Sequence, residues 1–294
     1  MKKILLLASL LLSLSLFAQE NNLKDTITSV SVNSYKKTTP ALLKKELEIR
    51  ALFNQISEND TRDSTRIRIN HEIRIKIAEA LKDSNSFFYP FDSLRYLGKI
   101  YSDDYNIRIY TWCCEMEDLS YKFYGFVQDF TNDLVYALTV RDAPYVPKRN
   151  RQVLLSNWYG ALYYKAIIVN PKKRDPKYIL LGWNQSDLKT KNKILDVLSI
   201  DDEGTDVRLG SKIFRGYNGR AHRMILSYCS DLGISLNYDE KEKRFVFDHL
   251  TPLSYDNDEP RGCNGPDMSY DALKSKRRGK RWVLKKDIDI KNEY

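Results

Sequence analysis

Alternation of apolar and polar side chains over the last two thirds of the chain restricts the fold more than any other sequence feature. Successive side chains of a β-strand point to opposite faces, so a period of two predicts a strand. In residues 107–114, Ile107 and Ile109 would share one face, and Arg108 and Tyr110 the other. We predict further strands at 123–127, 134–140, 162–169, 178–183, 194–200, 224–228, 234–238, 245–250 and 282–288. Short polar turns separate them, which favours an antiparallel meander, a sandwich or an open barrel.

Two helices are predicted ahead of this strand-rich region. The pair Thr39-Pro40 is typical of a helix start, with Thr39 as the N-cap and Pro40 at the first helical position. Apolar residues then recur at helical spacing to about Ser57. The segment from Arg66 to the residue before Asp83 is ambiguous, because its isoleucines fit both a strand and a helical stripe. Its length and its lack of internal Gly or Pro favour a helix.

These elements predict an α+β protein in which two N-terminal helices pack on a large antiparallel β structure. The expected divisions are a signal peptide at 1–18, a polar linker at 19–40, a helical segment at 41–83 and an antiparallel β domain at 84–294. A chain of this length forms one large domain or a domain with a helical extension.

The first residues have the pattern of a cleavable secretory signal peptide. Lys2 and Lys3 give a basic start, an apolar stretch runs to Phe17, and the chain turns polar after Ala18. The apolar run is shorter than a bilayer-spanning helix, and no later segment is long and apolar enough to span. We therefore expect cleavage after Ala18 and export to the periplasm or the cell surface. The alternative is an uncleaved N-terminal anchor.

Four cysteines, Cys113, Cys114, Cys229 and Cys263, would reach an oxidising compartment by this route. Four cysteines allow three pairings, and spacing alone does not choose among them. A bridge between the neighbours Cys113 and Cys114 would be strained. We expect one bridge from that pair to Cys229 or Cys263, with buried free thiols as the alternative. A metal site is disfavoured because no CxxC spacing or paired His accompanies the cysteines.

The formal charge of +9 comes from interspersed acidic and basic residues, a mixture typical of a solvated surface. The basic residues concentrate in one run near the C-terminus, which contains Lys276, Arg277, Arg278, Lys280 and Arg281. This run could contact a polyanion such as a lipopolysaccharide phosphate or an acidic glycan. The alternative is a hairpin tip at 278–280 that carries solvated charges. We expect no nucleic-acid partner for an exported chain without a nucleic-acid-binding motif.

A polar loop at 255–260 leads toward Asp267. Carboxylates from Asp256, Asp258 and Asp267 offer the oxygen ligands that Ca²⁺ takes. The spacing lacks the glycine and the distal glutamate of an EF-hand loop, so the alternative is a solvated, turn-rich loop. No other pattern in the sequence indicates a cofactor.

We recognise no catalytic motif in the sequence. His71 is followed by Glu72, but Ile75 occupies the position where the zinc-protease pattern His-Glu-x-x-His needs its second histidine. Asp248 and His249 are neighbours on a predicted strand, so their side chains point to opposite faces and cannot pair. A nucleophile elbow and a phosphate-binding glycine-rich loop are both absent. The sequence does not identify which of its 39 acidic residues would form the carboxylate pair of a glycosidase.

Five stretches form a recognisable combination. They are SFFYPFDSL at 86–94, RIYTW at 108–112, YILLGW at 178–183, FDHL at 247–250 and GPDMSYD at 265–271. Together they resemble a family of uncharacterised exported proteins from Bacteroidetes-type bacteria. The likeness runs from about Ala41 to the end of the chain. It implies the export compartment and one continuous domain, and it carries no activity or catalytic residues.

Three short segments are similar to the O-glycosylation acceptor of these bacteria, which is Asp, then Ser or Thr, then a small or aliphatic residue. They are residues 25–27, 63–65 and 92–94. Thr26 is the best candidate because it lies in the polar linker, where a modifying enzyme can reach it.

Two functions are compatible with these patterns. The first is a non-enzymatic periplasmic or surface protein that binds an envelope component, a glycan or a protein partner. The alternative is a hydrolase of envelope or dietary glycans whose carboxylates the sequence does not locate. A pocket with two facing acids of raised pKa would favour the hydrolase. A flat, exposed apolar or basic patch would favour the binding protein.

Overall fold

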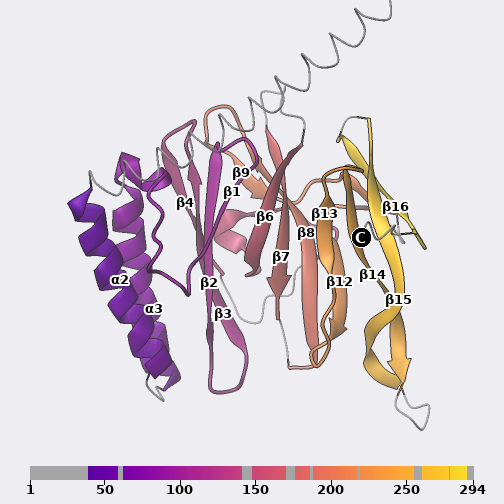
Figure 1. Ribbon diagram of the computed structural model, residues 1–294, viewed down its shortest axis with the longest axis horizontal. Coiled ribbons are helices and arrows are strands. Elements are labelled where there is room, and N and C mark those ends of the chain that lie inside the picture. The colour runs from indigo at the N-terminus through magenta and orange to yellow at the C-terminus, as the bar shows by residue number, and fades with distance from the viewer. Residues whose placement is uncertain are drawn as a thin grey trace, which may run out of the picture.

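The computed structural model describes residues 39–58, 62–140, 148–169, 176–185, 188–216, 219–254, 260–277 and 279–289. In this part of the chain, two helices and three β-sheets are stacked as layers, with the helices at one end and the third sheet at the other (Figure 1). The predicted α+β class, with N-terminal helices packed on antiparallel strands, is therefore confirmed. Among the predicted arrangements, the stack corresponds to a sandwich of three sheets.

Helices α2 (Pro40–Glu58) and α3 (Asp63–Leu81) form the first layer, as the sequence predicts. In α3, Ile69, Ile73 and Ile77 fall four residues apart and are buried. These three isoleucines therefore form a helical stripe against the neighbouring layer, whereas Ile67 and Ile75 of the same segment are exposed. None of the described helices combines the length and the hydrophobicity needed to cross a lipid bilayer.

The first sheet is an antiparallel meander of four strands. Its strands are β1 (Gly98–Tyr101), β2 (Ile107–Glu115), β3 (Tyr121–Asp129) and β4 (Leu134–Leu138). One face of the sheet packs against the helices through Tyr110, Trp112 and Phe126. The opposite face contributes Ile107 and Ile109 to a core shared with the second sheet. Alternate residues of β2 are thus buried on both sides of the sheet.

The second sheet has six strands and is covered on both faces. Its strands are β5 (Val153–Leu154), β6 (Leu162–Val169), β7 (Lys177–Asn184), β8 (Thr190–Ile200), β9 (Val207–Leu209) and β12 (Met224–Cys229). In β7, Tyr178 and Leu180 face the first sheet, whereas Ile179 and Leu181 face the third. Because the first and third sheets cover both faces of β7, this strand is apolar at nearly every position.

The third sheet has six strands in the order β11-β10-β16-β15-β14-β13. Their bounds are β10 (Phe214–Gly216), β11 (Gly219–Ala221), β13 (Leu236–Asp239), β14 (Arg244–Ser254), β15 (Pro260–Lys276) and β16 (Arg281–Lys285). Neighbours are antiparallel except for β10 and β16, which are parallel. The inner face buries Phe214, Phe245 and Trp282 against the second sheet. No other layer of the described chain covers the outer face (Figure 1).

Strand β15 corrects the prediction of a turn-rich loop leading to Asp267. The strand begins at Pro260 and continues past Asp267. It pairs with β14, with Leu250 opposite Pro266, and a register shift precedes Leu250. Prolines are tolerated where a bulge interrupts the ladder, so the segment extends the sheet despite its loop-like composition.

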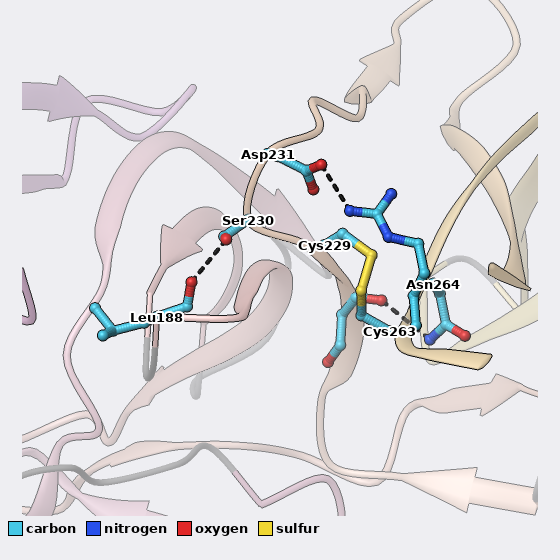
Figure 2. Close-up of a disulfide and its surroundings, with 8 residues drawn as sticks. Leu188, Cys229, Ser230, Asp231, Cys263 and Asn264 are labelled. Atoms are coloured by element: carbon cyan, nitrogen blue, oxygen red, sulfur yellow. Dashed lines mark hydrogen bonds and ion pairs between the residues drawn. A yellow bond between two sulfur atoms is a disulfide. The ribbon is translucent and has the colours of Figure 1, made fainter. Parts of the chain in front are cut away.

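A disulfide between Cys229 and Cys263 links the second sheet to the third. Cys229 ends β12 and Cys263 lies in β15, and their Cα atoms are 5.2 Å apart, within the usual range for a bridge. Figure 2 shows the bridge beside Asp231, which accepts a hydrogen bond from Arg261 at 2.7 Å. The bridge and the ion pair together hold the turn after β12 against the start of β15.

The prediction that Cys113 or Cys114 takes part in the bridge is wrong. Both lie on β2 in the first sheet and are free thiols, whereas the bridge spans the interface between the second and third sheets. Burial raises the pKa of Cys113 to about 12, and burial also raises the pKa of Cys114. Thiols held in the neutral form are poor nucleophiles, which makes a reactive role for this pair unfavourable.

Candidate functional site

The outer face of the third sheet brings together cations from strands far apart in the sequence. Arg220 in β11 lies opposite Arg215 in β10, and Arg215 lies opposite Val283 in β16. Val283 in turn lies opposite Lys274 in β15. Directly paired residues project on the same face of a sheet. One row across four strands therefore carries Arg220, Arg215 and Lys274.

Adjacent rows of β15 and β16 add three more cations to this face. Lys276 lies opposite Arg281. Lys285 lies two residues beyond Val283 on β16 and so projects in the same direction. We call the set the basic face, which consists of Arg215, Arg220, Lys274, Lys276, Arg281 and Lys285.

The charges of the basic face have no partner in the part of the chain that the structure describes. None of the six side chains forms a salt bridge there, whereas neighbouring Arg244 is paired with Asp239 at 2.9 Å. The pairs Arg215–Arg220 and Lys276–Arg281 place like charges directly opposite each other, an arrangement that destabilises a sheet. The fold thus retains a cationic surface that its own contacts do not neutralise.

The predicted basic run overlaps this face only in part. Lys276 and Arg281 belong to it, whereas Arg277 and Lys280 lie in the connecting turn. Arg278 lies outside the described residues. The predicted hairpin is confirmed, since Lys276 and Arg281 are paired across β15 and β16.

Arg215 and Arg220 were missed by the sequence reasoning. They reach the basic face through the parallel pairing of β10 with β16. That pairing joins segments more than sixty residues apart. The one local indication of this hairpin is the pair of glycines, Gly216 and Gly219, that flank its turn. Its strands are too short to show a clear alternation of apolar and polar residues.

The predicted Ca²⁺ ligands do not form a described site. Asp256 and Asp258 lie outside the described residues. The Asp267 carboxylate accepts hydrogen bonds from the backbone and the hydroxyl of Ser269, at 3.0 and 2.7 Å, and these bonds lower its pKa. Among the described residues, no group of three or more His, Cys, Asp or Glu side chains could hold a metal ion. Thr26, the predicted glycosylation site, also lies outside the described residues.

His249 pairs across the sheet instead of with its chain neighbour. Its Nδ1 lies 2.9 Å from a carboxylate oxygen of buried Asp271, whereas Asp248 accepts a hydrogen bond from the backbone N–H of Ser235 at 2.6 Å. The prediction that Asp248 and His249 cannot pair is confirmed. Asp271 also accepts from the backbone N–H of Asp287 at 3.0 Å. The Asp271 carboxylate therefore ties β14 and β15 to the segment after β16.

A buried ion pair, Asp196 with Arg223, lies in the interior. The Arg223 Nε is 2.9 Å from the Asp196 carboxylate, and both side chains are fully buried. The Tyr159 hydroxyl donates to the same carboxylate at 2.8 Å. Although burial disfavours the charged guanidinium, Asp196 holds the Arg223 pKa above its ordinary value. Groups closed off from solvent cannot touch a substrate, so this network is structural.

Neither of two surface pockets has the paired carboxyl groups of a glycosidase. A cleft beside the 92–96 segment contains Asp92 as its one acid, and a shallow hollow on α2 contains Glu48. Among the described carboxyl groups with a shifted pKa, only that of Asp103 is raised, by partial desolvation and by nearby Glu240 and Asp104. Asp103 lines neither pocket.

The basic face is therefore the described feature that best matches a functional surface. It carries the basic patch expected of a binding protein, whereas neither of the two pockets formed by described residues has the paired acids expected of a hydrolase. Comparisons with protein-family models, with curated proteins and with solved structures found no match to this chain.

Proposed function

We propose that the chain is an exported, non-enzymatic protein that binds an anionic glycan of the cell envelope on the basic face. The observation that carries the proposal is the set of six cations without salt bridges in the described chain, arranged across four strands of one sheet. Carboxylate or phosphate groups on a glycan would neutralise these charges.

The spacing of the face favours a polymer over a small ion. Neighbouring strands lie about 4.8 Å apart, so the row from Arg220 to Lys274 spans roughly 14 Å. A single small anion would contact one or two of these side chains. An extended polyanion would contact the whole row and would displace several counterions.

Two independent features support export. The N-terminal sequence has the signal-peptide pattern, with Lys2, Lys3 and an apolar run. The Cys229–Cys263 bridge would persist in an oxidising compartment. Membership of the exported Bacteroidetes-type family is part of the same proposal.

Binding to polygalacturonate, a carboxylated polysaccharide, tests the proposal at several salt concentrations. The double variant Arg215→Gln/Lys276→Gln removes one cation from each like-charge pair. We expect it to weaken binding about tenfold and to reduce the salt dependence, because fewer counterions are released. The matched control is Lys44→Gln/Lys82→Gln on the helix layer, which changes the net charge equally. Equal loss in both variants, or no binding by the unmodified protein, would contradict the proposal.

A further inference from the structure

Helix α2 and the third sheet lie at opposite ends of the layered fold (Figure 1). A cleft beside α2 has the chemistry of a second binding site. It encloses about 490 Å³ between α2 and the segment 92–96. The lining residues that matter here are Arg50, Phe53, Asn54, Asp92, Arg95 and Tyr96.

The wall formed by segment 92–96 is held in place from beneath. Buried Glu46 on α2 accepts a hydrogen bond from the Ser93 backbone N–H and another from the Tyr89 hydroxyl, both at 2.7 Å. The Lys99 ammonium donates to the carbonyls of Phe91 and Leu94, at 2.7 and 3.1 Å. A wall fixed by buried contacts is formed before any ligand binds, which lowers the entropic cost of binding.

Two arginines supply positive charge to the cleft. Arg50 lies one helical turn after Glu46 on α2. The Glu46 carboxylate accepts its hydrogen bonds from Ser93 and Tyr89 instead of pairing with Arg50. Within the described residues, neither Arg50 nor Arg95 forms a side-chain salt bridge. With Asp92 as the one acid among the lining residues, the cleft favours a ligand that carries an anionic group. Guanidinium groups bind carboxylates by charge-assisted hydrogen bonds.

An exposed aromatic ring lies beside these charges. Tyr96 is 56% exposed, and its ring centroid lies 6.1 Å from that of buried Phe53. Phe53 in turn packs edge-to-face on Trp112 at 6.2 Å. An accessible ring supported by a buried aromatic pair is a platform for the apolar face of a ligand. The nearby Asn54 amide and Asp92 carboxylate can exchange hydrogen bonds with hydroxyl groups.

We propose that this cleft binds a single sugar unit that carries a carboxylate, such as a hexuronate. The sugar carboxylate contacts Arg50 and Arg95, the ring face lies on Tyr96, and hydroxyl groups bond to Asn54 and Asp92. This site is independent of the basic face, because it lies in the helix layer and uses none of the same residues.

Calorimetric titration of the purified protein with glucuronate tests the assignment. Glucose and acetate are the companion probes, since each carries half of the proposed recognition chemistry. We expect glucuronate to bind at least tenfold more tightly than either. Absence of glucuronate binding, or equal affinity for acetate and glucuronate, would overturn the assignment of an acidic sugar.

Variants locate the binding within the cleft. Arg50→Gln, Arg95→Gln and Tyr96→Ala should each weaken glucuronate binding about tenfold, while Tyr96→Phe, which keeps the ring, should retain it. Each variant is first checked for an unchanged melting temperature. Arg215→Gln on the basic face should leave glucuronate binding unchanged. Because polygalacturonate is itself built of hexuronate units, Arg50→Gln is tested on dextran sulfate, a polyanion without uronate, and should leave its binding to the protein unchanged. If each variant loses the binding of only one ligand, the cleft and the basic face bind separately. A negative result at one site then does not count against the other.

Discussion

At the residue scale, the buried pair of Asp196 and Arg223 makes the strongest prediction about stability. Asp196→Ala leaves a buried guanidinium without its carboxylate, and we expect a loss of about 3–5 kcal/mol in the free energy of unfolding. Arg223→Met should also destabilise, because Arg223 donates to the carbonyls of Lys148 and Arg151 at 2.6 Å. Urea denaturation of both single variants and the double variant measures the coupling. If the double variant lost the full sum of the two single losses, the pair would not act as a unit.

His222 predicts how stability depends on pH. Burial, followed by the charges of Lys212 and Arg223, lowers the His222 pKa from its ordinary value of 6.5. The unfolded chain therefore binds a proton more readily than the folded chain, so stability falls as the pH drops through about 6.5. We expect His222→Gln to lose less stability than the unmodified protein between pH 7.5 and pH 5. Parallel stability curves for the two proteins would refute this role.

At the element scale, a glycine in strand β3 permits close strand packing. A Cβ at Gly125 would lie 2.7 Å from the Tyr110 carbonyl oxygen and 2.9 Å from a Leu138 methyl. We expect Gly125→Ala to cost about 1–3 kcal/mol, because backbone of the neighbouring strand must shift. Gly233→Ala is the matched control, since nothing lies within 4 Å of the added methyl. Thermal denaturation compares the two, and similar losses would argue against the strand contact.

The disulfide makes a prediction about the elements that it links. It closes a chain separation of 34 residues between β12 and β15, for which the chain-entropy model gives about 4 kcal/mol. We expect Cys263→Ser to lose most of this stability and Cys113→Ser to lose much less. The denatured, non-reduced protein should contain two free thiols, and a count of four would disprove the bridge.

The elements that the sequence predicted well are those with a local signal. Helix α3 was predicted from the length of its segment and the absence of internal Gly or Pro, both of which are local, because the spacing of its isoleucines fits a helix and a strand equally. Strand β15 has no such signal, since its Gly and Pro content is typical of turns. Its structure comes from pairing with β14, which supplies the partner and the bulges. Local composition cannot reveal a contact that depends on another segment.

At the scale of the whole molecule, the same limit applies to the candidate sites. Two of the six residues of the basic face, Lys276 and Arg281, could be predicted because they belong to one hairpin. Arg215 and Arg220 join it only through the parallel pairing of β10 with β16. The cleft also combines distant segments, since Arg50 lies on α2 and Tyr96 follows the helix pair. Both surfaces depend on contacts between segments that are far apart in the sequence.

The uncompensated charge of the basic face predicts an unusual response of the whole molecule to salt. Facing like charges at Arg215–Arg220 and Lys276–Arg281 should each cost about 0.2–1 kcal/mol, a repulsion that salt screens as the Debye length falls from about 10 Å at 0.1 M to about 3 Å at 1 M. The Arg215→Gln/Lys276→Gln variant should therefore unfold at a higher temperature than the unmodified protein at low salt. The difference should shrink as salt is added.

The same variant should change thermal stability and glycan binding in opposite directions. The variant that gains stability at low salt is the one expected to lose polygalacturonate binding. The clustered positive charges repel one another when the face is empty, and the same charges attract the anionic polymer. The Lys44→Gln/Lys82→Gln control should change neither property appreciably. A face variant that was less stable at low salt would mean that these cations contact groups within the fold, and the surface would then hold no free charge for a glycan. A gain in stability with intact glycan binding would instead move the binding site elsewhere on the molecule.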